Sequence, residues 1–352
     1  MNKKKIKVIV TSAGRSAGLN FCRCLRKSDI EYEIIGLEGN KYSFFQMEAD
    51  KKYFVPSYDD EKEFIIFLKR VIEETKADFL YPSKSDKELI IISKYRKELN
   101  INTYLPPHEI VEFYENKFLT YEYLKNEGIK VPYTEIINNE HDLKELFTKL
   151  GHVWLRCTHG SGGKGSLPTN NFELAKAWIN EFNGWGHFTG AEVLTPRTAT
   201  WSGLWKNGEL IVSQVRERIY WEFGYLNLSG VTGITGAQMT KRDKFIDELS
   251  ERIIRNSIKM PHGIIAIDYT YDKDGIPNPT EIQASRFYTS TFFMASLGLN
   301  FPDILVKAAL GIKIPEFINK YSPLEEGWVW IKFVDCLPKL VHKKEIESLG
   351  VE

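Results

Sequence analysis

Charge of one sign, long apolar runs and cysteine are all scarce in this sequence. Lysine plus arginine and aspartate plus glutamate each number 47, so the formal net charge is zero. Proteins that bind a nucleic-acid backbone carry a basic excess, and we therefore expect no nucleic-acid partner. No apolar run approaches the roughly 18 residues of a membrane span, and the basic residues 3–5 lead into a short strand pattern instead of a signal peptide. We expect no membrane partner either.

The chain has four cysteines, Cys22, Cys24, Cys157 and Cys336. This number is too small for the disulfide framework of a secreted protein. Cys22 and Cys24 also lack a second Cys or His pair at zinc spacing. We expect reduced thiols and a cytoplasmic location.

What the sequence does contain is the composition of a globular protein. Hydrophobic residues make up 43% and charged residues 27%, which excludes a disordered or fibrous chain. A length of 352 residues suggests two or three domains. We place their boundaries at 1–106, 107–187 and 188–352, because two prolines at 106–107 end the first unit and a strand-rich block starts at 188.

Strand and helix patterns alternate in the first unit. A β-branched run at 6–11 ends in a small-residue turn, and an amphipathic stretch follows to residue 25. Further strands are expected at 33–37, 53–55 and 78–81, with helices at 61–74 and from 87. This alternation predicts a parallel sheet with helices on its faces, so the fold class is α/β.

The remaining chain mixes both element types. We expect helices over 107–127, 141–150 and 172–182, strands at 153–156, 263–271 and 279–283, and mainly strands over 188–238. A Lys-Asn-Gly-Glu turn at 206–209 and an Asp-Lys-Asp-Gly turn at 272–275 indicate two hairpins.

A glycine-rich segment follows the strand at 153–156. Four glycines, Gly160, Gly162, Gly163 and Gly165, occur within six residues, and Arg156 and Lys164 add positive charge at the ends of the segment. Such a turn presents backbone amides that can close on phosphate oxygens. A mobile surface turn has the same composition, and the Walker pattern is absent.

Three oxygen-bearing side chains belong to the second hairpin. Glu281 and Gln283 point to one face because strand side chains alternate, and Asp268 lies on the partner strand, thirteen residues before Glu281. Two carboxylates and an amide oxygen on one face suit Mg²⁺. An ordinary hairpin with a solvated polar face is the alternative.

These pieces occur in the order and spacing of the ATP-grasp superfamily. The chain resembles its carboxylate-amine ligases, and most of all a single synthetase unit of the carbamoyl-phosphate synthase large chain. The resemblance covers nearly the whole chain and includes a helix that begins at Asn116-Lys117 and runs to residue 128. It implies an ATP-grasp fold preceded by a Rossmann-like parallel-sheet domain. The chain has room for one such unit, whereas the large chain needs two.

The resemblance also implies a nucleotide and metal site. ATP and Mg²⁺ are the implied cofactors, with Mn²⁺ as an alternative metal. Asp268 and Glu281 match the metal ligands, Gln283 stands beside them, and Arg286 resembles the arginine that steadies the phosphates or the acyl phosphate. The implied nucleotide contacts are Lys117, Arg156, the loop residues Gly160, Ser161, Gly162, Gly163, Lys164 and Gly165, the hinge residues Glu192, Val193 and Leu194, and Thr198.

The implied reaction is the ATP-dependent activation of a carboxylate as an acyl phosphate, followed by attack of an amine or a thiol and release of ADP and phosphate. Arg156 and Arg286 are the implied catalytic residues. Arg216 and Arg218 alternate to one strand face and are candidates to hold a substrate carboxylate, although a solvated strand face explains them equally well. Arg15 is a further substrate candidate. A homodimer is compatible with this interpretation.

Three departures from the family pattern motivate other hypotheses. Gln283 replaces the usual asparagine, Thr198 stands where many members have a ribose-binding glutamate, and Arg286 lies five residues after Glu281 instead of four. A catalytically inactive ATP-binding module or regulator is therefore the alternative function. A dinucleotide-dependent oxidoreductase is a third hypothesis, built on residues 6–37; the turn at 12–18 is not Gly-x-Gly-x-x-Gly, although Glu38 follows the second strand as an acidic ribose ligand would.

Overall fold

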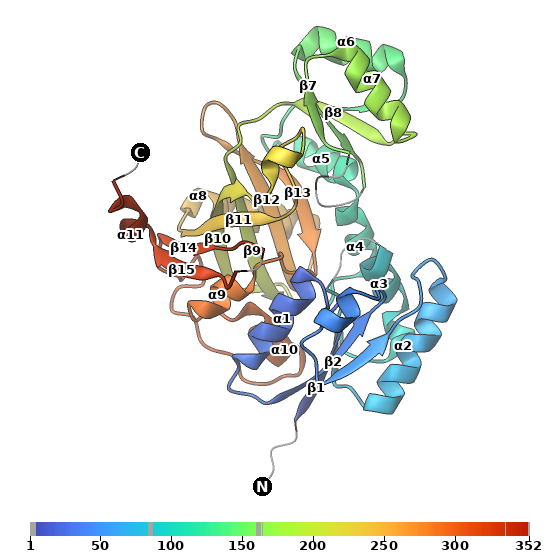
Figure 1. The fold of residues 1–352 in the computed structure, drawn as a ribbon, viewed down its shortest axis with the longest axis vertical. Coiled ribbons are helices and arrows are strands. Elements are labelled where there is room, and N and C mark those ends of the chain that lie inside the picture. The colour runs from blue at the N-terminus through green and yellow to red at the C-terminus, as the bar shows by residue number, and fades with distance from the viewer. Residues whose placement is uncertain (1–4, 84–86, 160–162, 164, 335, 351–352) are drawn as a thin grey trace.

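The computed structural model describes residues 5–83, 87–159, 163, 165–334 and 336–350. Its helices and strands form three sheets with helices around them (Figure 1). The nucleotide-loop candidates Gly160, Ser161, Gly162 and Lys164 lie outside the described residues.

The first sheet is parallel and has the strand order β3-β2-β1-β4. Val8, Ile9 and Val10 of β1 are all fully buried, because helices cover both faces of the sheet. The parallel sheet predicted from strand–helix alternation is confirmed. Its elements are β1 (Ile6–Val10), α1 (Ser16–Arg26), β2 (Tyr32–Glu38), β3 (Lys51–Phe54), α2 (Glu61–Thr75), β4 (Phe79–Tyr81) and α3 (Lys87–Leu99), with a short 3₁₀ turn at Ser43–Gln46.

The second sheet is small and antiparallel, with the order β5-β8-β6-β7. Helices α6 and α7 pack on it around Leu143, Leu146 and Ile179, and this unit lies at the top of Figure 1. The sheet extends to Glu192, the last residue of β8, and therefore runs past position 187. Its elements are β5 (Thr134–Ile137), α6 (Glu140–Leu150), β6 (Val153–Cys157), β7 (Leu167–Thr169), α7 (Phe172–Glu181) and β8 (Phe188–Glu192).

The third sheet is a seven-stranded antiparallel sheet, β13-β12-β9-β10-β11-β14-β15. Asn207 and Gly208, both with positive φ, make the tight turn between β9 and β10, as the sequence predicts. Its elements are β9 (Thr198–Lys206), β10 (Glu209–Trp221), β11 (Thr235–Lys241), α8 (Lys244–Ser257), β12 (Gly263–Tyr271), β13 (Pro277–Ala284), α9 (Phe292–Ser296), α10 (Phe301–Ala309), β14 (Trp328–Ile331), β15 (Lys339–His342) and α11 (Lys343–Glu347), with a 3₁₀ turn at Gly224–Leu226.

The helical segment expected over 107–127 is two helices, α4 (His108–Glu115) and α5 (Lys117–Asn126). The break falls at Asn116, whose Oδ1 accepts hydrogen bonds from the backbone N–H groups of Phe118 and Leu119 at 3.0 and 3.1 Å. This is an N-cap, so a new helix begins at Lys117. Tyr114 and Leu124 of the two helices join the apolar core of the large sheet.

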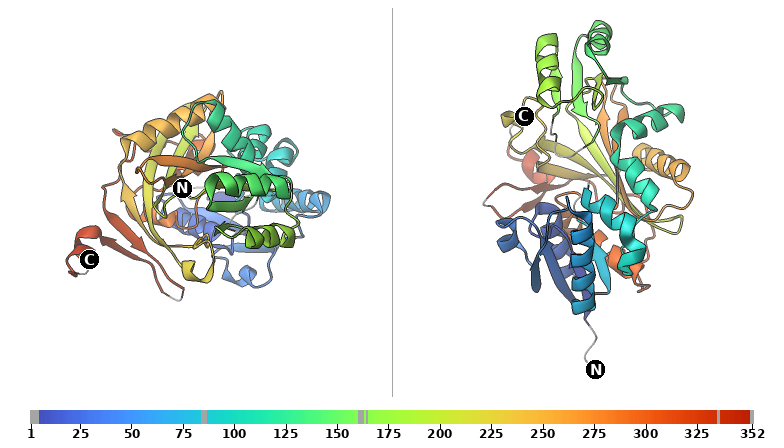
Figure 2. Two further views of the ribbon diagram at one scale, coloured as in Figure 1. Left: turned by 90° about the horizontal axis from the view of Figure 1, so that it is seen from above. Right: turned by 90° about the vertical axis from the view of Figure 1, so that its right-hand side faces the viewer.

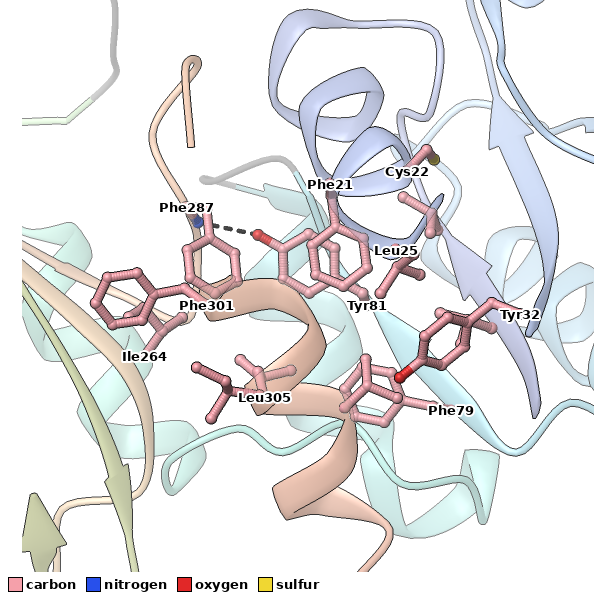
Figure 3. Close-up of a cluster of buried hydrophobic side chains, with 14 of the residues drawn as sticks. Phe21, Cys22, Leu25, Tyr32, Phe79, Tyr81, Ile264, Phe287, Phe301 and Leu305 are labelled. Atoms are coloured by element: carbon pink, nitrogen blue, oxygen red, sulfur yellow. Dashed lines mark hydrogen bonds between the residues drawn. The ribbon is translucent and has the colours of Figure 1, made fainter. Parts of the chain in front are cut away.

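A buried aromatic cluster joins the first sheet to the large sheet (Figure 3). The rings of Phe21 and Tyr81 stack at 3.8 Å between centroids, and Phe287 and Phe301 pack beside them. The Tyr81 hydroxyl oxygen accepts a hydrogen bond from the Phe287 backbone N–H at 2.9 Å. The end of β4 therefore lies directly beside the segment that follows β13, and Figure 2 shows the first sheet below the large one. Among the described residues, no helix combines the length and apolarity needed to cross a membrane.

Candidate functional site

One row of directly paired residues crosses the large sheet. Glu281 of β13 pairs with Asp268 of β12, Asp268 with Thr200 of β9, Thr200 with Arg216 of β10, and Arg216 with Thr240 of β11. Directly opposed residues of an antiparallel sheet point to the same face. The row therefore places carboxylates at one end of a polar face and an arginine nearer its middle.

The two carboxylates of the row share one neighbour. The Gln283 amide Nε2 donates to Asp268 Oδ2 at 3.3 Å and to Glu281 Oε1 at 3.2 Å. Thr200 Oγ1 donates to the other Asp268 oxygen at 2.5 Å. The hairpin brings together the three residues that the sequence predicts as metal ligands, and their role as ligands stays a prediction.

The donor set fits a magnesium ion. No group of three or more His, Cys, Asp or Glu side chains suited to a metal occurs in the described part of the chain. Asp268, Glu281 and the Gln283 amide instead offer hard oxygen atoms around one point. A half-turn of the amide replaces Nε2 by Oε1 there, because the two atoms occupy equivalent positions. Mg²⁺ prefers such oxygen ligands and commonly takes the rest from phosphates and water.

Basic side chains approach Glu281 from three elements. Lys117 Nζ lies 3.8 Å and Arg286 Nη2 3.7 Å from Glu281 Oε1, and both side chains are mostly buried. Arg156 Nη1 donates to the Thr280 carbonyl at 3.1 Å. Burial lowers the pKa of Arg156, and the charge of Glu281 opposes this shift. The structure thus brings all three predicted cations to the same end of the row.

Two local features place these cations. The Asn116 cap starts α5 at Lys117, whose backbone N–H donates to the carbonyl of Thr158 at 3.1 Å and so ties the helix to the end of β6. The pairing of β12 with β13 shifts by one residue after Asp268, leaving Thr280 as a bulge. A bulged residue lacks a ladder partner, which leaves its carbonyl available to Arg156.

The described part of the glycine-rich segment is tightly packed. Gly163 and Gly165 have φ angles of 72° and 75°, in the left-handed region that favours glycine. A Cβ on Gly163 would lie 2.8 Å from the Val231 carbonyl oxygen, and one on Gly165 would lie 2.7 Å from Cys157 Sγ. Gly163 therefore lies against the loop before β11, which belongs to the large sheet.

The predicted hinge connects the two antiparallel sheets. Glu192 ends β8 and its side chain is exposed, while its backbone N–H donates to the Tyr133 carbonyl at 2.8 Å. Val193 and Leu194 follow in the connection to β9, and Thr198 begins that strand. Thr198 Oγ1 accepts a hydrogen bond from Arg218 Nη1 at 2.6 Å. The contacts of these four residues with a nucleotide stay predictions.

Arg216 and Arg218 lie on the polar face, as their alternation predicts, but a solvated strand face does not describe them. Arg216 is only 4% exposed, and its guanidinium lies over the Tyr288 ring at 4.2 Å. Arg218 lies over the Trp221 ring at 3.5 Å and donates to Thr235 Oγ1 at 3.1 Å. Burial and, to a lesser extent, the charge of Arg216 lower the pKa of Arg218 to about 9, and the charge of Asp268 opposes this shift.

Arg15 lies apart from the row, at the end of the first strand. Its Nε is 3.8 Å from Glu38 Oε1, and its side chain is 53% exposed. Glu38 is buried and accepts hydrogen bonds from the backbone N–H groups of Gly14 and Asn40 at 3.2 and 3.0 Å. The dinucleotide hypothesis needs an accessible Glu38, and this burial argues against it.

Sequence reasoning missed three residues near Arg216. The ring of Tyr288, after β13, lies over Arg216, the charge of Arg216 acts on Lys332, after β14, and Gln238 of β11 pairs with Arg218 on the same face. Tyr288 lies two residues after Arg286 and so had a local signal. Gln238 and Lys332 had none, because their strands join the sheet only through long connections.

Comparisons with known proteins identify the fold. No protein-family model matches the chain, and no curated protein matches it. N5-carboxyaminoimidazole synthetase from Staphylococcus aureus is similar at 15% identity and a TM-score of 0.67, over 94% of this chain and 83% of that one. A biotin carboxylase–β,γ-ATP complex from Campylobacter jejuni is similar at 15% identity and a TM-score of 0.71, over 93% of this chain and 75% of that one. L-amino acid ligase from Bacillus licheniformis is similar at 14% identity and a TM-score of 0.68, over 94% of this chain and 79% of that one.

The likeness covers nearly the whole chain and shows the ATP-grasp fold with its Rossmann-like N-terminal domain, as predicted. At these identities it shows the fold alone. The finer resemblance to carbamoyl-phosphate synthase stays a prediction.

Proposed function

We propose that the protein is an ATP-dependent ligase that activates a carboxylate as an acyl phosphate and joins it to an amine or a thiol acceptor, releasing ADP and phosphate. One observation carries this proposal. Asp268 and Glu281 converge on the Gln283 amide, while Lys117 and Arg286 approach Glu281 to within 3.8 Å. Carboxylates ringed by cations suit a metal–nucleotide complex. The solved structures that share the fold include one with ADP and one with ATP, which supports nucleotide use.

In this proposal the nucleotide lies between the two antiparallel sheets. Lys117 and Arg156 hold its phosphates, and the segment 160–165 covers them with backbone amides. The hinge residues Glu192, Val193 and Leu194 meet the adenine through their backbone, and Thr198 lies near the ribose.

Asp268, Glu281 and Gln283 would hold Mg²⁺, or Mn²⁺ in its place. The metal supplies positive charge to the phosphate oxygens. The chain's own contribution is positional, because Thr200 fixes the Asp268 carboxylate and Gln283 links it to Glu281. No nucleophilic side chain is needed.

The reaction has two steps. An oxygen of the substrate carboxylate attacks the γ-phosphorus of ATP, the bond to the β–γ bridging oxygen breaks, and ADP leaves. The nitrogen or sulfur of the acceptor then attacks the acyl carbon, the carbon–oxygen bond to phosphate breaks, and the acceptor's proton leaves with the phosphate or to water. Arg156 and Arg286 balance the negative charge on the transferred phosphoryl group, and Arg216, Arg218 and Arg15 are the candidates that bind the substrates.

The test is ADP and phosphate release from Mg-ATP across a panel of carboxylic acids combined with amines and thiols. We expect release that depends on one acid–acceptor pair and that falls at least about 100-fold in Glu281→Gln, because a metal site loses an essential charge. The matched control is Glu217→Gln, on the opposite face of the same sheet, where Glu217 pairs with Arg197 and Lys241. Equal release by wild type and Glu281→Gln contradicts the proposal.

An ATP-binding module without catalysis is the second candidate. It is favoured by the Gln283 amide, whose nitrogen faces both carboxylates, and by Thr198, which already accepts the hydrogen bond of Arg218. ATP binding without turnover on any acid–acceptor pair would support it.

A further inference from the structure

The cations of the polar face form two separate groups. Lys117, Arg156 and Arg286 gather around Glu281 at the β13 edge. Arg216 belongs to the same row but lies three strands from Glu281, on β10, and its charge acts on Lys332. In the proposed function the first group serves the nucleotide, so the second group needs another explanation.

Arg216 is the centre of the second group. Its side chain is 4% exposed, and neither Nε nor Nη1 has a hydrogen-bond partner among the described residues. The Tyr288 ring covers one side of the guanidinium at 4.2 Å. A buried charge with unsatisfied donors costs several kcal/mol, so its presence points to a ligand that supplies the missing acceptors.

Among the described residues, Arg216 forms no ion pair. The charge of Asp268 acts on Arg216 only at longer range, and its two oxygens already accept hydrogen bonds from Thr200 and Gln283. Burial and the charge of Arg216 lower the pKa of Lys332, and Glu222 opposes this shift. Within the described residues, the buried guanidinium of Arg216 is therefore not neutralised by a direct ion pair.

Neighbouring polar atoms are unpartnered as well. The Tyr288 hydroxyl and Gln238 Oε1 are buried and have no partner in the described part of the chain. Gln238 Nε2 donates to Ser290 Oγ at 2.7 Å, which holds the amide next to the segment after β13. A ligand with oxygen atoms at this place meets a cation and a hydroxyl donor together.

The distance across the sheet separates this place from the reacting carboxylate. Arg216 lies two strands from Asp268 and three from Glu281, or about 10 and 14 Å at the backbone. A carboxylate that receives a phosphoryl group beside Glu281 needs a free oxygen. A carboxylate held by both oxygens in a bidentate arginine pair lacks one.

Resting on the proposed function, we infer that the activated acid carries a second anionic group, several bonds from the reacting carboxylate, and that Arg216 binds this group with Lys332 nearby. The substrate class is thus a dicarboxylate or a phosphorylated carboxylate. Tyr288 fixes the plane of the guanidinium, so that Arg216 is preorganised for two parallel hydrogen bonds.

The first experiment measures binding without turnover. The probes are succinate, glutarate and 3-phosphonopropionate as dianions, and butyrate and valerate as monoanions, titrated calorimetrically into the full chain. We expect the dianions to bind to the wild type. Their affinity should fall at least about 30-fold in Arg216→Met and recover in part in Arg216→Lys. The phosphonate arm separates a phosphate-like second group from a carboxylate.

Arg197→Met is the matched control. Arg197 also lies over a tyrosine ring, Tyr271, at 4.1 Å, but it pairs with Glu217 and lies on the opposite face. We expect wild-type binding of dianions in this variant. Unfolding of Arg216→Met is checked in parallel, and the ligand-free variant should be as stable as wild type or more stable, because it loses an uncompensated buried charge.

The second experiment compares turnover. In wild type the ratio of kcat/KM for a dianionic acid to that for its monoanionic counterpart should be at least about 30, and in Arg216→Met it should approach one. Equal turnover of both acid classes by wild type overturns the inference. An equal loss of Mg-ATP affinity in Arg216→Met also overturns it, because Arg216 then contacts the nucleotide.

The experiments distinguish failure of the ligase proposal from failure of the inference that Arg216 binds a second anionic group. Arg216-dependent binding of dianions without ADP release on any acid supports the dianion site and contradicts the ligase. ADP release that depends on Glu281 but not on Arg216 supports the ligase and contradicts the dianion site.

Discussion

The two faces of the seven-stranded sheet treat buried charge in opposite ways. On the face toward α8, Asp247 is buried and accepts hydrogen bonds from Trp201 Nε1, Ser213 Oγ and Ser322 Oγ at 2.8, 2.8 and 3.1 Å. On the other face, Arg216 is equally buried and leaves two nitrogens without a partner among the described residues. The buried carboxyl of Asp247 has its hydrogen-bond partners within the protein, whereas in our proposal the buried guanidinium of Arg216 finds its missing partners in a ligand.

Two arginines of this sheet, one on each face, differ in the same way. Arg197 and Arg216 both lie over tyrosine rings, at 4.1 and 4.2 Å. Arg197 Nε donates to Glu217 at 2.6 Å, while Arg216 Nε and Nη1 have no hydrogen-bond partner in the part of the chain that the structure describes. Stacking on an aromatic ring therefore does not distinguish the two arginines. They differ in whether their guanidinium N–H groups have hydrogen-bond acceptors.

The largest expected effect tests the apolar face. Trp201 is fully buried and lies over Gly203, where a Cβ would come within 2.0 Å of the ring. Trp201→Ala creates a cavity and removes a donor from Asp247, so we expect a loss of about 3–5 kcal/mol in the free energy of unfolding. Chemical denaturation measures it. A loss below about 1 kcal/mol would show that packing of Trp201 on this face contributes little to the stability of the fold.

A smaller effect tests the polar face at the adjacent position. Thr200→Val removes the hydrogen bond to Asp268 with little change in shape. We expect a 10- to 100-fold fall in ADP release, since Thr200 orients a candidate metal ligand, and a change in unfolding free energy of about 1 kcal/mol or less. ADP release and the free energy of unfolding are measured on the same preparation, so that an effect on activity is distinguished from an effect on stability. A large stability loss with unchanged specific activity would reverse the assignment.

The smallest effect concerns pH. Burial raises the pKa of Asp247, so between about pH 4 and that value the folded state holds a proton that the unfolded state has released, and the stability contributed by this group falls as pH rises. Hydrogen bonds from Lys130 and from backbone N–H groups lower the pKa of Asp272, so its contribution is lost as pH falls below about 4.

We therefore expect opposite slopes for two variants. The difference in unfolding free energy, wild type minus Asp247→Asn, should decrease from pH 3 to 6, and wild type minus Asp272→Asn should increase. Urea unfolding at several pH values measures both, and slopes of the same sign would contradict the assignment.

Much of the fold was predictable because local patterns and tertiary packing agree. The β-branched run at 6–11 forms β1, and the turn at Asn207 and Gly208 forms with the expected positive φ angles. The hairpin of β12 and β13 also forms, and it brings Asp268 to Glu281 and Gln283.

Other features were not predictable from local pattern. The helical pattern over 107–127 does not show where α4 ends, because the pattern continues through Asn116, whose capping side chain starts α5; only the family resemblance placed a helix start there. Arg216 and Arg218 were correctly placed on one face, but their burial had no local signal. Solvation of a strand residue depends on the elements above it, and these come from distant parts of the chain.

The sequence by itself determined which side chains of a strand share a face, because side chains alternate along each strand. In β9 and β12 the residue types largely alternate with them, while β10 has polar residues on both faces. Only the tertiary structure decided which polar residues lost their solvent. The segment after β13 brings Tyr288 over Arg216, and β14 brings Lys332 to the same place. Burial and hydrogen-bond satisfaction are properties of neighbours distant in sequence, so the unpaired charge that marks the second anion site is visible only in the folded chain.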